Sequence, residues 1–183
     1  SKLIKNFLLL KDQKINIMVT GATGCGKSST INALFDTEVA KVGVGVDPET
    51  MSIQKYELDN LILWDSPGLG DGKEADTNHA RNIIKKLNEL DENGKLLIDL
   101  VLVIVNGSSR DLGTSYDLIN NVIIPNLGDN KENRILVAIN QADVAMQGRH
   151  WDYEKNEPKP PLVKFLNDKV KSVQRRIKEG TGV

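Results

Sequence analysis

The chain has 183 residues, of which 39% are hydrophobic, and this is enough for one soluble domain with a buried core. Its formal net charge of −1 gives no indication of a broad nucleic-acid or anionic-membrane surface. No apolar run approaches the roughly 20 residues of a membrane-spanning helix, and we expect a cytoplasmic protein. The single cysteine, Cys25, excludes an internal disulfide and suits a reducing compartment.

Helical and strand patterns alternate along the chain. A short amphipathic stretch predicts an N-terminal helix over 1–12. Strands are predicted over 15–20, 51–58, 61–65, 98–105 and 134–140, and helices over 27–35, 76–92, 114–124 and 161–179. The segment 144–160, which contains a glycine and two prolines and is followed by Pro161, is predicted to be a long loop, and the sequence does not indicate its function.

Hydrophobic patterning indicates how these strands are arranged. The runs within 98–105 and 134–140 are apolar throughout, as is typical of strands buried on both faces of a parallel sheet. Residues 51–58 alternate instead, and Asp59-Asn60 can turn them into 61–65 as an antiparallel edge hairpin. We therefore expect an α/β fold over residues 1–183: a three-layer sandwich with a mostly parallel sheet and one antiparallel edge strand.

A phosphate-binding loop is the most specific motif in the chain. Residues 21–28 match the P-loop pattern G-x-x-x-x-G-K-[ST] between a predicted strand and a predicted helix. In such a loop the backbone N–H groups face the α and β phosphates, Lys27 reaches the β and γ phosphates, and the Ser28 hydroxyl ligates Mg²⁺. The predicted phosphate contacts are Gly21, Ala22, Thr23, Gly24, Cys25, Gly26, Lys27, Ser28 and Ser29. For Cys25 we expect the backbone to matter, while redox control through its thiol stays an alternative.

Two further motifs lie at predicted strand ends. Asp65-Ser66-Pro67-Gly68 places Asp65 where a carboxylate can hold Mg²⁺ through water, and Gly68 where its N–H can meet a γ-phosphate. Asn140-Gln141-Ala142-Asp143 follows the strand 134–140. Asp143 can accept hydrogen bonds from guanine N1–H and the N2 amino group, which adenine does not offer.

With these three motifs in order over residues 15–143, the chain resembles P-loop GTPases of the translation-factor class, specifically the Era-like group. Its P-loop is also similar to that of interferon-inducible GTPases. The resemblance implies a P-loop GTPase fold, GTP and GDP as ligands, and Mg²⁺ held by Ser28, Asp65 and a switch I threonine. Of Thr37 and Thr50, Thr50 has the family-like place before the edge strand. Lys27, Thr50 and Gly68 are the implied catalytic residues, and Gln141 lies in the guanine loop.

Four departures from the family pattern bear on activity. Leu69 replaces the glutamine that orients the attacking water in Ras-like proteins, and Gly24 replaces the asparagine that binds potassium in several Era-like enzymes. Gln141 replaces a lysine that packs over guanine, so we expect weaker affinity with guanine preference kept by Asp143. No S-A-[KL] loop follows residue 143, and we expect the last strand and helix of the domain to be missing after Val183.

Other polar residues have simpler interpretations. His79 and His150 lack paired partners and are expected at the surface, as is Arg110. The basic residues of 169–178 are expected to form a solvated helix face, with an RNA or ribosome contact as the alternative.

The sequence thus favours a switch that binds GTP with Mg²⁺ and hydrolyses it slowly. A nucleotide-dependent binding module with negligible hydrolysis, a dynamin-like membrane-associated GTPase and an ATP-using P-loop protein are the alternatives. The expected partners are guanine nucleotide, a ribosome or RNA, and a second copy in a GTP-dependent dimer.

Overall fold

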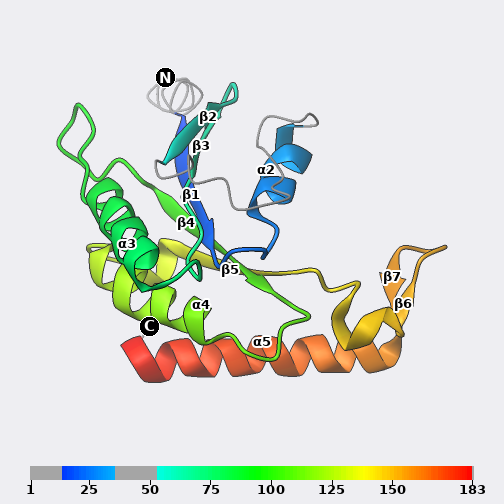
Figure 1. Ribbon diagram of the computed structural model, residues 1–183. Helices are drawn as coiled ribbons and strands as arrows, with labels where there is room; N and C mark the ends of the chain where they lie inside the picture. Colours follow the sequence, from blue (N-terminus) through cyan, green and yellow to red (C-terminus); the bar gives the residue numbers. More distant parts are fainter. Residues whose placement is uncertain (1–13, 36–52, 183) are drawn as a thin grey trace, which may run out of the picture.

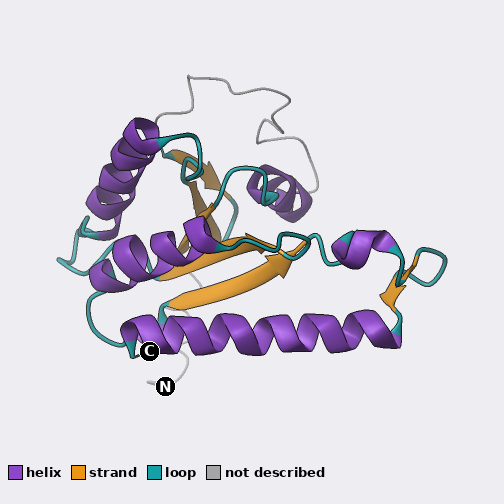
Figure 2. Cartoon of the chain, turned by 60° about the horizontal axis from the view of Figure 1, so that its bottom comes forward, coloured by secondary structure: helices purple, strands orange, loops and turns teal. Residues whose placement is uncertain are grey.

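The computed structural model describes residues 14–35 and 53–182, which form a three-layer α/β sandwich (Figures 1 and 2). The predicted N-terminal helix 1–12, Thr50 and the first two residues of the predicted strand 51–58 lie outside the described residues. The elements that form the sheet and its covering layers are β1 (Ile15–Gly21), α2 (Lys27–Phe35), β2 (Gln54–Glu57), β3 (Leu61–Asp65), α3 (Lys73–Leu87), β4 (Leu100–Asn106), α4 (Gly113–Asp117), β5 (Ile135–Asn140) and α5 (Pro160–Thr181).

The sheet has the strand order β2-β3-β1-β4-β5. Strands β3, β1, β4 and β5 are parallel, and β2 pairs with β3 antiparallel at one edge. The predicted fold class is therefore confirmed, including the antiparallel edge strand. Because the carboxyl ends of parallel strands meet at one edge of the sheet, the three motifs are brought to the same side of the molecule.

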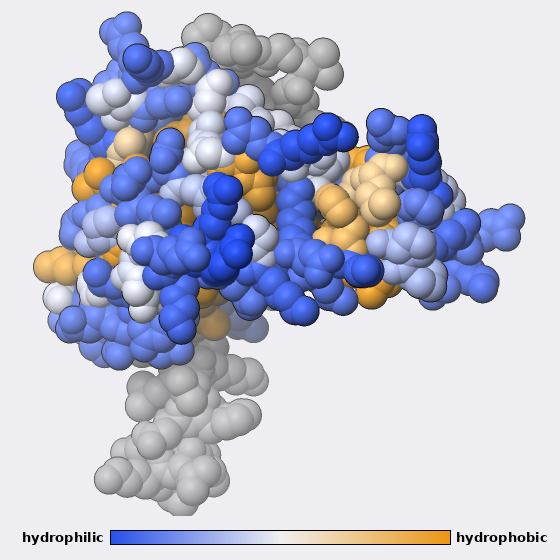
Figure 3. All heavy atoms as spheres, turned by 90° about the horizontal axis from the view of Figure 1, so that it is seen from below, coloured by the Kyte–Doolittle hydropathy of each residue, from blue (hydrophilic) through white to orange (hydrophobic). Residues whose placement is uncertain are grey.

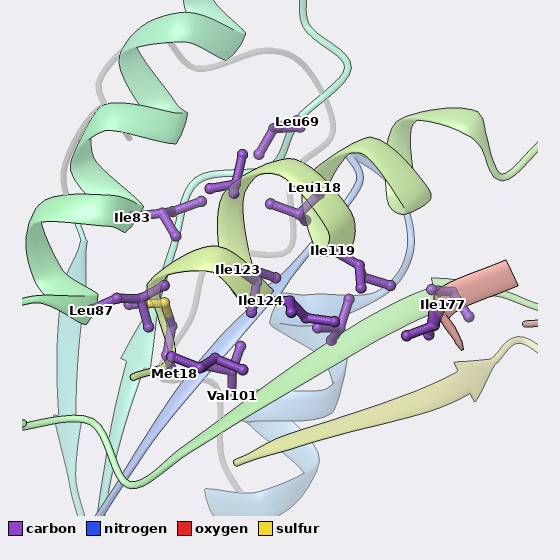
Figure 4. Close-up of a cluster of buried hydrophobic side chains, with 14 of the residues drawn as sticks. Met18, Leu69, Ile83, Leu87, Val101, Leu118, Ile119, Ile123, Ile124 and Ile177 are labelled. Atoms are coloured by element: carbon purple, nitrogen blue, oxygen red, sulfur yellow. The ribbon is translucent and has the colours of Figure 1, made fainter. Parts of the chain in front are cut away.

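Helices cover both faces of this sheet, which explains the unbroken apolar runs in its central strands. In β4, Val101, Val103 and Val105 belong to the cluster beneath α3, α4 and α5. Ile104 points to the other face and packs with Ile31 of α2. The larger cluster fills the space between the sheet and its helices (Figure 4).

The predicted helix 114–124 consists of three consecutive pieces. After α4 come a π-helical turn, η1 (Leu118–Ile123), and a 3₁₀ turn, η2 (Ile124–Asn126). Pro125, which has no backbone N–H to donate, stands where the helix tightens and ends. Shorter elements follow as η3 (Lys131–Asn133), η4 (Ala145–Gly148), and a hairpin of β6 (Trp151–Asp152) and β7 (Glu157–Pro158).

The long helix α5 closes the described part of the chain (Figure 1). Val173 and Ile177 on its inner face are buried in the larger core cluster. Seen from the side on which α5 lies, the surface is mainly hydrophilic with apolar side chains between the charged ones (Figure 3). Among the described residues, no helix combines the length and apolar character needed to cross a membrane.

Core packing gives a first prediction. Ile119 is fully buried beneath α3 and α5, so Ile119→Ala should lower the free energy of unfolding by about 2–5 kcal/mol. The matched control is Leu90→Ala, whose side chain is 58% exposed and whose effect should stay within about 0.5 kcal/mol. Urea unfolding followed by circular dichroism measures both, and equal effects of the two substitutions would contradict this account of the core.

Candidate nucleotide-binding site

The three sequence motifs meet at the carboxyl edge of the sheet. The P-loop connects the end of β1 to the start of α2, Asp65 is the last residue of β3, and Asn140 is the last residue of β5. The structure therefore brings the P-loop, Asp65, Gly68, Asn140 and Gln141 to one edge of the sheet, and Asp143 follows in the loop after β5.

Side chains of the predicted guanine loop hold the P-loop directly. Asn140 Nδ2 donates to the carbonyl oxygen of Cys25 at 3.0 Å, and Gln141 Nε2 donates to that of Gly24 at 3.0 Å. Gln141 adopts a left-handed backbone with φ 55°, which is uncommon for a residue other than glycine. The amide of Gln141 thus makes a polar contact with the P-loop without the charge of the lysine it replaces.

The close approach of these loops explains the glycine at position 26. Gly26 has φ +94°, and a Cβ atom added there would lie 2.3 Å from Asn140 Nδ2. A larger residue would push the guanine loop away from the phosphate loop. Gly26 is therefore required by packing within the protein as well as by access to phosphate.

The loop after β3 is joined to the P-loop through its backbone. The Thr23 N–H donates to the Leu69 carbonyl at 2.8 Å, and Ala22 and Leu69 form a parallel bridge. A Cβ atom on Gly68 would lie 2.8 Å from Thr23 Oγ1 and 3.0 Å from Lys27 Nζ. Gly68 therefore lies against the amine that the P-loop motif assigns to phosphate.

The side chain of Leu69 is part of the hydrophobic core. It is 7% exposed and packs in the cluster that also contains Met18, Ile83 and Leu118 (Figure 4). A buried leucine can neither donate to nor accept from a water molecule. The residue at the position of the Ras-like glutamine is thus a packing residue.

His79 is not at the surface, and that expectation is wrong. Its side chain is 6% exposed on α3, and its Nδ1 lies 2.8 Å from the Gly68 carbonyl oxygen. Because a carbonyl can only accept, Nδ1 carries the hydrogen in this contact. His79, Ile83 and Leu87 are the buried residues of α3, and this four-residue spacing is the signal that could have predicted the burial.

Asp65 has the properties expected of a cation ligand. Its Oδ1 is buried and has no hydrogen-bond partner among the described residues. Burial raises the pKa of this carboxyl from 3.8 to about 6, although the positive charge of Lys27 acts in the opposite direction. A divalent cation would satisfy the unpaired oxygen, and with the Ser28 hydroxyl in the first turn of α2 the donor set fits Mg²⁺.

The thiol of Cys25 is buried beneath α2, in the smaller core cluster. Burial raises the pKa of this thiol, with the charge of Lys27 opposing the shift. The neutral thiol is therefore favoured, and a neutral thiol is a weak nucleophile. These findings agree with a role for Cys25 through its backbone, whose carbonyl receives Asn140.

The basic stretch of α5 is not entirely a solvated face. Lys169 Nζ donates to the carbonyl oxygens of Gly107 and Ser109, each at 2.6 Å. The pKa of Lys169 is lowered by burial. Lys169 therefore fixes the loop that follows β4, whereas Arg110 in the same loop is exposed as expected.

A pocket of about 390 Å³ opens beside the end of β5. The sequence indicated its first side, the guanine loop, but gave no role to the residues of its second side, which belong to the β6–β7 hairpin. The lining residues are Ile139, Asn140, Gln141, Ala142, Asp143, Trp151, Tyr153 and Asn156.

This geometry agrees with what is found among known proteins. The family described as 50S ribosome-binding GTPase matches residues 16–141. The chain belongs to this family of P-loop GTPases. The match includes the first two motifs and the first two residues of the third, Asn140 and Gln141.

Individual relatives share the domain at moderate identity. The Escherichia coli protein YfjP is 32% identical over 133 residues, which are 70% of this chain and 42% of YfjP. Mouse interferon-inducible GTPase 1 is 40% identical over 62 residues, which are 31% of this chain and 15% of that protein. The chain spans less than half the length of either relative.

Solved structures agree on the fold. Toc33 from Arabidopsis thaliana, in complex with GDP and Mg²⁺, superposes with a TM-score of 0.65 at 20% identity. The match covers 100% of this chain and 70% of the Toc33 chain. At this identity the likeness supports the fold alone.

The raised pKa of Asp65 predicts a pH dependence of stability. Between about pH 4 and 6 the native carboxyl keeps a proton that the unfolded chain releases, so stability falls as the pH rises through this window. The loss should be on the order of 3 kcal/mol without Mg²⁺ and nucleotide, from 1.36 kcal/mol per pKa unit. The measurement is urea unfolding of wild type and Asp65→Asn from pH 4 to 7. Asp65→Asn should lack this component, and a difference between the two proteins that does not change with pH would contradict it.

Proposed function

We propose that this domain is a guanine-nucleotide switch that binds GTP and GDP with Mg²⁺ and hydrolyses GTP slowly. The observation that carries the proposal is the joining of the guanine loop to the phosphate loop through Asn140 and Gln141. A base held at Asp143 and a phosphate chain held in the P-loop would then be two ends of one ligand.

Each part of the nucleotide has a proposed contact. The backbone of residues 21–29 surrounds the phosphates, and Lys27 neutralises their charge. Ser28 and Asp65 hold Mg²⁺, together with Thr50 of switch I, and the cation supplies further neutralisation of the β and γ phosphates when bound. Asp143 accepts from the guanine N1–H and N2 amino group.

The γ-phosphate sensor is proposed to be Gly68. Its carbonyl is held by His79 of α3, and its neighbour Leu69 is paired with the P-loop backbone. A hydrogen bond from the Gly68 N–H to a γ-phosphate would therefore shift a segment that contacts both α3 and the P-loop. We propose that GTP orders this segment and switch I, and that hydrolysis to GDP releases them.

We expect slow hydrolysis because of the residues at positions 69 and 24. Leu69 is buried and cannot orient a water molecule, and Gly24 has no side chain to bind a potassium ion. Without an inserted positive charge, turnover is expected about 10³- to 10⁵-fold below that of a fully assembled site. These same two positions favour the second candidate, a binding module with negligible hydrolysis.

A second copy of the chain is a proposed source of activation. Dimerization is important for the GTPase activity of the chloroplast translocon components Toc33 and Toc159, which share the fold. The proposed switch would serve Era-like work on a ribosome or RNA in the cytoplasm, or dynamin-like work at a membrane. These two downstream roles remain alternatives.

Guanine selectivity tests the proposal. Wild type should bind GTP and GDP in preference to ATP, and Asp143→Ala should weaken guanine-nucleotide binding roughly tenfold or more by removing a charged hydrogen-bond acceptor. The control is Asp168→Ala on α5, which removes an exposed carboxylate outside the site and should leave affinity unchanged. Isothermal titration calorimetry gives the affinities. Equal binding of ATP and GTP by wild type, or unchanged selectivity in Asp143→Ala, would contradict the proposal.

Hydrolysis can be tested separately from binding. Single-turnover hydrolysis of GTP by wild type should be slow and equal in potassium and sodium salts, because position 24 offers no side-chain ligand. In Gly24→Asn the new side chain enters open space, and asparagine tolerates the φ of +76° found there. This variant should respond to potassium. A potassium response in wild type would show that the cation binds elsewhere and would contradict the assignment of Gly24.

A further inference from the structure

The hairpin of β6 and β7 stands opposite the guanine loop, across the 390 Å³ pocket. Trp151 and Asp152 form its first strand and pair antiparallel with Pro158 and Glu157. In Figure 1 the hairpin lies beyond the end of β5, next to the start of α5. The volume is within the range of pockets that hold small molecules.

The aromatic residues of this hairpin are not used to build the core. Neither Trp151 nor Tyr153 belongs to the two buried clusters, and the side chain of Tyr153 is 67% exposed. Large aromatic side chains that face a pocket and remain accessible are typical of binding surfaces. Tyr153 is therefore largely open to a ligand, and Trp151 is partly so.

The hairpin is held in place before any ligand arrives. The Lys159 N–H donates to the His150 carbonyl at 2.8 Å and closes the base of the hairpin. Asp152 Oδ1 accepts from the backbone N–H groups of residues 154 and 155, each at 3.2 Å. Ala145 before the hairpin and Leu162 after it are fully buried. A hairpin that is already ordered lowers the conformational entropy cost of binding a ligand.

The chemistry of the pocket selects a flat, neutral ring that carries hydrogen-bond donors. Asp143 is the single charged residue among its lining side chains, so the pocket repels phosphate and favours donors. The other polar groups of the lining are the Tyr153 hydroxyl and the amides of Asn140, Gln141 and Asn156. The amide nitrogens of Asn140 and Gln141 donate to P-loop carbonyls. No group of three or more His, Cys, Asp or Glu side chains suited to a metal ion occurs in the described part of the chain.

We propose that residues 150–158 form an aromatic wall for the guanine base, with Trp151 stacking on the ring and Tyr153 covering its outer edge. The inference rests on the proposed function and adds a recognition element to it. It also accounts for Gln141, whose amide is turned to the Gly24 carbonyl and which replaces the lysine stem that would pack over the base. Stacking on an aromatic ring supplies the missing contact with the base.

The affinity of hairpin variants for GDP tests whether the aromatic wall contacts the base. Trp151→Ala should weaken GDP binding roughly 5- to 100-fold, the range expected for the loss of one base–aromatic stack. Trp151→Phe keeps a flat π-face and should recover most of the affinity. Tyr153→Ala, at a largely exposed position that does not threaten folding, should weaken GDP binding several-fold. The matched control is Phe165→Ala on α5, which removes an aromatic side chain outside the pocket and should have no effect.

Fluorescence gives an independent readout of contact. The chain has two tryptophans, so Trp64→Phe leaves Trp151 as the reporter. Saturating GDP should change the emission of this variant, because a stacked purine alters the surroundings of the indole. Wild-type binding of GDP that is unaffected by Trp151→Ala and Tyr153→Ala, with no emission change in Trp64→Phe, would overturn the wall and leave the proposed switch standing. Failure of wild type to bind GDP would instead overturn the switch itself.

Discussion

The hydrogen bond from Asn140 to the carbonyl of Cys25 joins the end of β5 to the loop after β1, although these two strands are not neighbours in the sheet. Strand β4 lies between β1 and β5, so the contact must pass over the end of β4. The chain makes room for this contact with Gly107, where an added Cβ atom would lie 2.7 Å from the Asn140 carbonyl oxygen. The backbone N–H of Gly107 donates to that same oxygen at 2.7 Å. The site therefore depends on a small residue at the end of β4 as well as on its motif residues.

The phosphate loop is held from both sides by this arrangement. On one side the guanine loop donates two side-chain amides to P-loop carbonyls, and on the other the Leu69 backbone pairs with Ala22. The Gly24 and Cys25 carbonyls therefore accept from the guanine loop, while the Thr23 and Cys25 N–H groups donate to the Leu69 and Ala22 carbonyls. These contacts make the geometry of the guanine loop and that of the P-loop interdependent.

The sequence was most informative where hydrophobic patterns were long. The apolar strands 98–105 and 134–140 and the alternating strand before 61–65 all appear in the sheet, because burial on two faces or one face leaves a clear pattern. The segment 144–160 is predicted as a loop but contains the β6–β7 hairpin, because two-residue strands are too short to show any period. The burial of His79 depends on how α3 packs against the Gly68 loop, and this tertiary contact leaves no pattern of paired ligands in the sequence.

The location of Leu69 limits where catalysis can come from. Its backbone is paired with the P-loop and its side chain fills the core beside Met18, so a polar residue at this position would bring an unpaired polar group into an apolar cluster. The fold therefore uses this position for stability and for joining the Gly68 loop to α3. A water-orienting group must then come from backbone atoms, from another part of the chain or from a partner. Such a division would suit the proposed switch if a partner completes the site, because hydrolysis would then be controlled from outside the domain.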